Sequence, residues 1–137
     1  MDSVTDWSGR YKGRSLVVGL HTPGKPTGTT IVRPHLRVKR VKGESCAAWQ
    51  YRIKDEGGST FEAVGIATRS SNGRPLLTVS EQRVLDAQGQ PTNEFSSGIL
   101  QATKMHGNRV TAIELLLTSS NFPPLVVQGH LERRKSS

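Results

Sequence analysis

Cysteine is almost absent from this chain, because Cys46 is the only one among 137 residues. A disulfide within the chain is therefore excluded, and a reducing compartment is the expected environment. Long apolar runs are also missing, and the N-terminus lacks the basic segment followed by an apolar stretch that a secretory signal requires. These absences predict a cytoplasmic protein without a transmembrane segment.

Motifs for metal, nucleotide and nucleophile chemistry are missing as well. The four histidines, His21, His35, His106 and His130, are scattered without the spacing of zinc ligands. Gly24-Lys25 lacks the upstream glycine and the following Ser or Thr of a phosphate-binding loop, and no GxSxG or GxGxxG pattern occurs. We therefore expect no metal and no cofactor, and the sequence alone identifies no catalytic residue.

Helical periodicity is missing too, and short turn signals recur in its place. Asn72-Gly73, Gly107-Asn108 and the stretch 86–91 supply residues with the φ values of tight hairpins. The half-polar runs between such turns predict eight strands, over residues 10–20, 30–41, 45–55, 59–70, 74–86, 92–106, 109–120 and 124–135. The length is that of one ordinary domain, so we expect a single domain over residues 1–137.

The connections between these strands are short, which predicts antiparallel hairpins in an up-and-down meander. Such a sheet has two exposed edges unless its first strand pairs with its last, and closure into a barrel removes both edges. We therefore expect an all-β fold, a single antiparallel meander of about eight strands that closes into a β-barrel. A two-sheet β-sandwich is the alternative.

Side-chain alternation along a strand assigns residues to the two faces of the sheet. In the strand predicted over residues 30–41, one face carries Val32, Leu36 and Val38, and the other carries Arg33, His35, Arg37 and Lys39. In the next strand, Trp49, Tyr51 and Ile53 face inward, and Gln50, Arg52 and Lys54 face outward. The basic side chains are therefore expected outside the barrel, on adjacent strands.

The formal charge of +8 comes entirely from the first 54 residues. They hold 11 Lys and Arg against three acids, so 11 − 3 = +8, and the remainder carries eight bases and eight acids. This asymmetry predicts an anionic partner, whether a nucleic acid, a membrane surface or an acidic ligand, although a solvated basic face would have the same composition. The anion-binding candidates are Arg33, His35, Arg37, Lys39, Arg52 and Lys54.

Three predicted strands, over residues 74–86, 92–106 and 109–120, carry apolar side chains on both faces. β-Bulges, a covering loop or a protein partner would each produce this pattern. We favour an oligomer interface on this side, which predicts a homodimer.

The segment 7–11, Trp-Ser-Gly-Arg-Tyr, leads into a strand, a longer loop and a meander. This resembles the opening of the calycin barrels, the superfamily of lipocalins, fatty-acid-binding proteins and avidins. Lipocalins carry Gly-x-Trp at the start of the first strand, where this chain has Gly9-Arg10-Tyr11. The resemblance implies that Arg133 packs over the Tyr11 ring, and that the loop 21–29 lies over one mouth of the barrel. The chain is short for a lipocalin and shows neither its C-terminal helix nor the two lid helices of the fatty-acid-binding proteins.

Three functions follow as hypotheses. The first is a barrel that binds an apolar or amphipathic small molecule, including an anionic one, in its lumen. The expected contacts are Trp49, Tyr51, Tyr11, Leu36, His21 and Lys25. The alternative is that Trp7 and Tyr11 only fill the core. The second is a polyanion-binding or nucleic-acid-binding protein that uses the outer basic face. The third is a cofactor-independent isomerase, cyclase or lyase that uses one of the strand carboxylates Glu62, Glu81, Glu94 and Glu114. The sequence does not decide between binding and catalysis.

Overall fold

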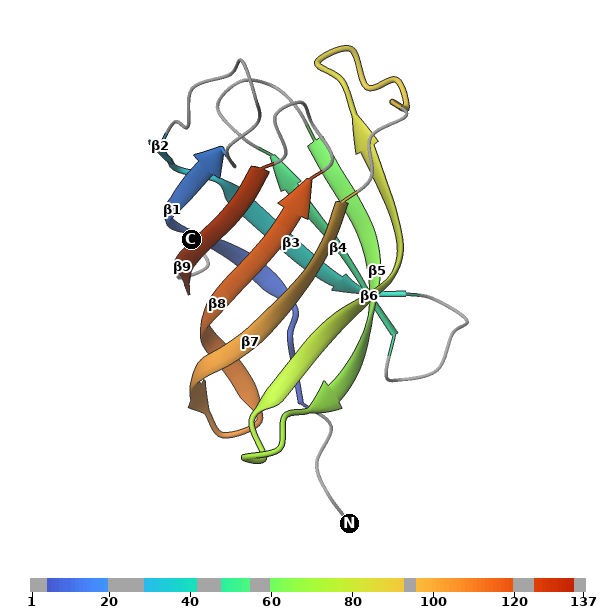
Figure 1. Ribbon diagram of the computed structural model, residues 1–137. Helices are drawn as coiled ribbons and strands as arrows, with labels where there is room; N and C mark the ends of the chain where they lie inside the picture. The colour runs from blue at the N-terminus through green and yellow to red at the C-terminus, as the bar shows by residue number, and fades with distance from the viewer. Residues whose placement is uncertain are drawn as a thin grey trace.

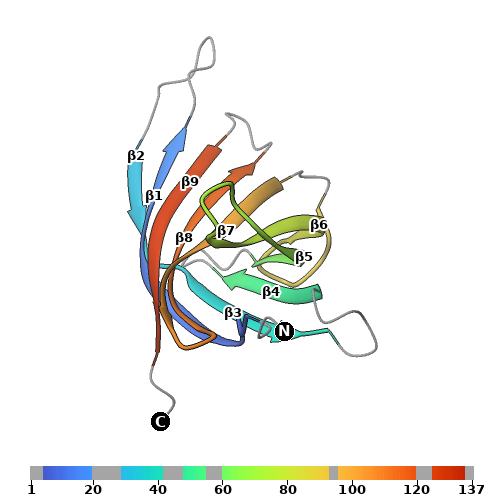
Figure 2. The same ribbon diagram turned by 90° about the horizontal axis from the view of Figure 1, so that it is seen from below.

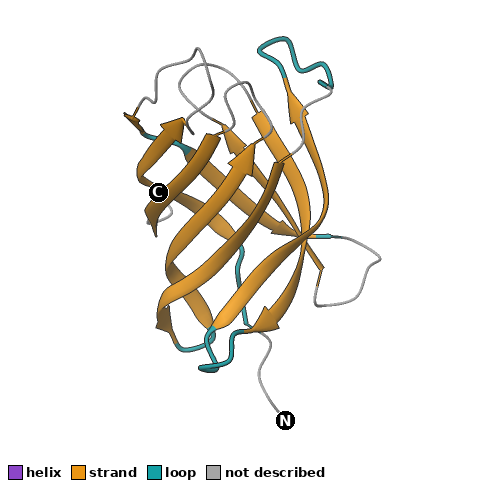
Figure 3. Ribbon diagram, viewed as in Figure 1, coloured by secondary structure: helices purple, strands orange, loops and turns teal. Residues whose placement is uncertain are grey.

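The computed structural model describes residues 5–19, 29–41, 48–54, 60–92, 96–119 and 125–134. Nine strands lie in these ranges: β1 (Gly9–Gly19), β2 (Thr29–Val32), β3 (His35–Arg40), β4 (Ala48–Lys54), β5 (Thr60–Arg69), β6 (Pro75–Leu85), β7 (Ser96–His106), β8 (Arg109–Ser119) and β9 (Leu125–Arg133) (Figure 1). Only strands and loops are drawn for these ranges in Figure 3. Within them, no helix is long and apolar enough to cross a membrane.

The strands form one antiparallel sheet that closes on itself. The order is β1-β3-β4-β5-β6-β7-β8-β9, and β9 pairs back onto β1 from Tyr11–Arg133 to Gly19–Leu125. Seen from below in Figure 2, the strands run around a common interior. The predicted all-β meander that closes into an eight-stranded barrel is confirmed, and the sandwich alternative is excluded.

β2 and β3 are two pieces of one barrel strand. Ser15 of β1 pairs with Val32 of β2, and Lys12 of β1 pairs with His35 of β3. Both intervals are three residues long, so the register on β1 continues unbroken from β2 to β3. Pro34 has no backbone N–H to donate to the sheet, which interrupts the strand there. The single strand predicted over residues 30–41 is corrected in this respect. The other predicted strand ends differ from the observed ones by at most four residues.

Three hairpin turns have the geometry that their sequences predict. Gly73, Gly89 and Gly107 have φ angles of 83°, 81° and 61°, in the left-handed region that favours glycine. In the β5–β6 turn, the Ser70 N–H donates to the Arg74 carbonyl oxygen at 2.8 Å. These turns keep consecutive strands adjacent and antiparallel.

Inward-facing side chains from β1 and from β3 to β9 form one continuous core. Its members include Leu36, Tyr51, Phe61, Leu77, Leu100, Leu115 and Leu131. The strands with apolar residues on both faces contain bulges, one of the three predicted causes. Bulges lie at Ser80 in β6 and near Thr103 in β7, where the pairing shifts register. Ile99 and Leu116 are exposed on the outer face by 41% and 46%.

Candidate functional site

The lumen wall contains the predicted ligand contacts that the structure describes. Tyr11, Leu36, Trp49 and Tyr51 all belong to the core and are at most 2% exposed. They come from three strands, β1, β3 and β4, which are neighbours in the barrel. His21 and Lys25 lie outside the described residues.

Six buried side-chain polar atoms among the described residues have no hydrogen-bond partner; Ser15 Oγ, Trp49 Nε1 and Tyr51 Oη lie on the lumen wall, and the others are Trp7 Nε1, Thr103 Oγ1 and Arg133 Nη1. Buried donors and acceptors nearly always have one, and leaving such a group unpaired costs about 1–3 kcal/mol. Tyr51 packs against Phe61, with 6.0 Å between the ring centroids. Burial raises the pKa of Tyr51 well above its ordinary value, so its hydroxyl keeps the proton that it could donate to a ligand.

The end of the barrel at the chain's N-terminus is closed by residues that precede β1. The Asp6 N–H donates to the Asn108 carbonyl oxygen at 2.7 Å, and the Val110 N–H donates to the Asp6 carbonyl oxygen at 2.9 Å. Trp7 is completely buried there. The Tyr11 hydroxyl donates to the Trp7 carbonyl oxygen at 2.8 Å and so fixes this N-terminal segment, residues 6–8, which we call the plug.

Charges around the plug fix the ionisation of Asp6. Burial opposes ionisation, but hydrogen bonds from Ser8 and the charges of Arg133 and Arg109 outweigh it and hold the pKa of Asp6 below its ordinary value. The Ser8 hydroxyl donates to Asp6 Oδ1 at 2.6 Å, and Arg109 Nε lies 3.7 Å from Asp6 Oδ2. Asp6 is therefore a carboxylate that ties the N-terminal segment to β8.

Gly9 and Arg133 occupy the positions named in the resemblance to calycin barrels. Arg133 is directly opposite Tyr11 in the β1–β9 pair, so the two side chains share the inner face. Gly9 has a φ of 134°, and a Cβ built there would lie 2.8 Å from Arg133 Nε. A larger residue would therefore be strained and would displace Arg133. The closed antiparallel eight-stranded barrel is compatible with a calycin-like architecture.

The outer face of β1, β3 and β4 carries two rows of basic side chains. Arg10 faces Arg37, which faces Arg52; in the next row, Lys12 faces His35, which faces Lys54. A groove with about 230 Å³ of open space lies over these rows. We call it the basic groove; its basic lining residues are Arg10, His35, Arg37, Arg52, Lys54 and Arg134.

Four of the six predicted anion-binding residues line the basic groove, and two do not. Arg33, His35, Arg37 and Lys39 are all exposed, as the alternation predicts. Arg33 and Lys39 nevertheless lie outside the groove lining. The predicted anion-binding set did not include Arg10 and Arg134, although the predicted pairing of the first and last strands was the signal that points to both. The Arg134 N–H donates to the Arg10 carbonyl oxygen at 2.8 Å, which brings the two residues together.

The strand glutamates give the cavity-enzyme hypothesis little support. Glu62 is buried, yet it faces Arg52 across β4 and β5 on the outer side and forms an ion pair with it. Glu114, which the sequence singled out, is exposed on the outer face of β8. The side chains of Glu81 and Glu94 are outside the description. No described glutamate therefore faces the lumen as the acid or base that this hypothesis requires.

Among the described residues, no group of three or more His, Cys, Asp and Glu side chains could hold a metal ion. Comparison with protein-family models, with curated proteins and with solved structures finds no match for this chain. The site's own geometry is therefore the basis for a functional proposal.

Proposed function

We propose that this protein binds a polyanion in the basic groove on β1, β3 and β4. One observation carries the proposal: five Arg and Lys side chains and His35 surround a single groove on the outer wall. Glu62 forms an ion pair with one member of this group, Arg52. Like charges held together repel one another, and a polyanion that enters the groove relieves the repulsion and releases its own counterions.

The spacing of the cations suits a ligand with repeated negative groups. Arg10, Arg37 and Arg52 lie on successive strands, which are about 4.8 Å apart. The aromatic residues of β4, Trp49 and Tyr51, are buried on the opposite face and cannot stack on bases bound in the groove. Contacts to phosphate groups therefore carry the binding, and we expect it to be independent of nucleotide sequence.

The test measures the affinity for a labelled single-stranded oligonucleotide at several salt concentrations. The Arg10→Gln and Arg37→Gln double variant should bind more weakly, and the slope of log affinity against log salt should fall by about 0.7 for each lost phosphate contact. A heparin fragment should compete, because charge and not base identity is recognised.

A matched control removes the same charge elsewhere. Arg74 and Lys104 are exposed and lie outside the groove. Their double replacement by Gln should leave the salt slope unchanged. Equal weakening by both double variants would show that only net charge matters, and affinity that does not respond to salt would contradict an electrostatic mechanism.

A second candidate function is binding of an amphipathic small molecule in a calycin-like lumen. The three unpartnered polar groups, Ser15 Oγ, Trp49 Nε1 and Tyr51 Oη, support it, because a ligand with matching polar atoms would satisfy them within an apolar wall. The barrel would then carry two sites, one in the lumen and one on its outer wall.

The lumen candidate is tested with a fluorescent amphipathic probe, an anilinonaphthalene sulfonate. The Trp7→Phe background leaves Trp49 as the only tryptophan, so a saturable change in its emission reports on the lumen. Tyr51→Phe removes one hydroxyl; it should weaken the probe's binding about two- to tenfold while leaving the stability of the free protein unchanged or higher. This candidate is refuted if the change in Trp49 emission does not saturate, or if the probe binds the proteins with and without Tyr51→Phe equally well.

A further inference from the structure

A row of exposed apolar side chains crosses five strands on the outer face. Ile31 on β2 faces Leu16 on β1, and beyond Gln128 on β9 the row continues with Leu116 on β8 and Ile99 on β7. Ile31 is 64% exposed, Leu16 40%, Leu116 46% and Ile99 41%. Single exposed apolar residues are common on soluble proteins, but contiguous apolar rows usually mark an interaction surface.

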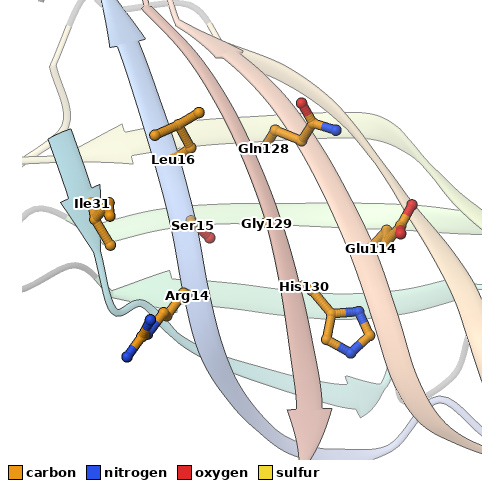
Figure 4. A pocket seen from close by; sticks show the side chains of 8 residues that line it. All are labelled: Arg14, Ser15, Leu16, Ile31, Glu114, Gln128, Gly129 and His130. Carbon is orange, nitrogen blue, oxygen red and sulfur yellow. The ribbon is translucent and has the colours of Figure 1, made fainter. Parts of the chain in front are cut away.

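The row is symmetric about β9. On either side of Gln128 stands first a leucine and then an isoleucine. In the next row along the strands, His130 takes the central position, with Arg14 on one side and Glu114 on the other. Figure 4 shows the second row, Arg14, His130 and Glu114, and the part of the apolar row made by Ile31, Leu16 and Gln128. The face is therefore matched in shape and opposite in charge on the two sides of β9.

We propose that this face is the interface of a homodimer whose two-fold axis runs along β9. That axis lays β1 of one protomer against β8 of the other. Leu16 then meets Leu116 of the partner subunit, and Arg14 meets Glu114 of the partner subunit. Because the interface is isologous, each contact occurs twice.

The charge pattern selects this axis over the other two-fold axis that a face-to-face pair could use. A two-fold axis across the strands keeps each strand opposite its own copy, so Arg14 on β1 would never meet Glu114 on β8 of the partner subunit. Both charges would then be buried without an opposite charge, which is costly. Within one chain Arg14 and Glu114 lie two strands apart, about 10 Å between backbones, with His130 between them. Both side chains are exposed, so each can reach a second copy.

A hollow at the centre of the face gives side chains of a second copy a place to enter. It has about 330 Å³ of open space and is lined by Arg14, Leu16, Ile31, Glu114, Gln128 and His130 (Figure 4). Strands tilt by about 35–45° in barrels of this kind, so two barrels related by an axis along a strand cross each other. Contact is then confined to the strands next to β9, and we expect a dimer that dissociates on dilution.

The interface and the basic groove do not compete. The groove lies over β3, β4 and the ends of β1 and β9 near Arg10 and Arg134, whereas the proposed interface is centred on Leu16 and Gln128, six residues away along each strand. Dimerisation would leave it open in both protomers. The dimer is therefore independent of the proposed polyanion binding.

Charge reversal tests the axis directly, by sedimentation velocity over a range of protein concentrations. Arg14→Glu alone and Glu114→Arg alone each place like charges at both ion-pair contacts, so each should raise the dissociation constant of the dimer about tenfold or more. An equimolar mixture of the two variants should form a heterodimer, because every contact again joins opposite charges. Its affinity should return close to that of the unmodified protein.

Two controls separate this geometry from general charge effects. Arg74→Glu makes the same charge change in the β5–β6 turn and should leave dimerisation unchanged, while Leu116→Ser should weaken it without altering the charge. A protein that stays monomeric at its highest attainable concentration would overturn the proposal. So would a mixture that associates no better than its components, or an Arg74→Glu variant as impaired as Arg14→Glu.

Discussion

Replacing Gly129 with alanine should strain the seam at which the barrel closes. A Cβ at this position would lie 2.0 Å from Ser15 Oγ, 2.8 Å from Ser15 Cβ and 2.9 Å from the Arg14 carbonyl oxygen. Atoms cannot approach so closely, so the Ser15 side chain or the β1 backbone must move. Overpacking of this kind costs about 1–3 kcal/mol, and the loss of a flexible glycine from the unfolded chain returns about 0.5–1 kcal/mol. We expect a net loss of about 1–2 kcal/mol.

The compensating change lies directly across the seam. Ser15→Gly removes both side-chain atoms that an alanine at position 129 would meet. By itself it should alter stability little, because losing a buried unpaired hydroxyl is favourable and adding a strand glycine is unfavourable by a similar amount. In the double variant the alanine should therefore cost at least about 1 kcal/mol less than it does alone.

Urea unfolding of the four proteins in this cycle measures the coupling. Gly13→Ala is a matched control on the same seam: its Cβ would lie 2.1 Å from the His130 carbonyl oxygen, a backbone atom that Ser15→Gly does not remove. That variant should be destabilised with or without Ser15→Gly. If the Gly129→Ala and Ser15→Gly effects instead add to within about 0.5 kcal/mol, Ser15 does not face Gly129 and the register of β1 on β9 is refuted.

Three further results are expected. Tyr11 and Tyr51 are the only tyrosines; burial raises both pKa values, so ultraviolet absorbance should show no tyrosinate at about pH 10, and the free energy of unfolding should fall as the pH rises above that value. Because the pKa of Asp6 is lower in the folded than in the unfolded protein, its ionisation stabilises the fold above about pH 4, and this stabilisation is lost on acidification. Asp6→Asn should therefore make the free energy of unfolding, measured with urea, depend less on pH in the acid range. Glu62→Gln frees Arg52 from its ion pair and should strengthen oligonucleotide binding in the salt titration.

Several features of this barrel follow from local sequence alone. Turn residues such as Gly73 and Gly107 adopt positive φ because the hairpins need it, and they divide the chain into strands. Alternation of Arg37 with Leu36 and Val38 assigns one face to the core and the other to solvent, since a shift by one residue would bury the charges.

Other features could not be read from the chain. Pro34 splits a strand whose alternation is otherwise unbroken, because a missing donor leaves no mark in the pattern of apolar residues. In the sequence, Glu62 has the pattern of an ordinary solvent-facing strand glutamate. It is nevertheless buried beside Arg52, because β4 pairs with β5 in a register that sets the two residues opposite each other. The sequence places the expected oligomer interface on the strands that became β6, β7 and β8, and the interface that we propose is instead centred on β9.

Local chemistry thus determined the strands, their faces and the outward position of the basic residues, because the alternation of side chains is a property of each strand by itself. The pairing of β1 with β9 depended on the closed barrel, since it joins residues more than a hundred positions apart. That pairing brings Arg134 to the basic groove and sets Leu16 and Arg14 opposite Gln128 and His130. Both proposed surfaces combine residues from strands distant in sequence, so only the register of the folded sheet could assemble them.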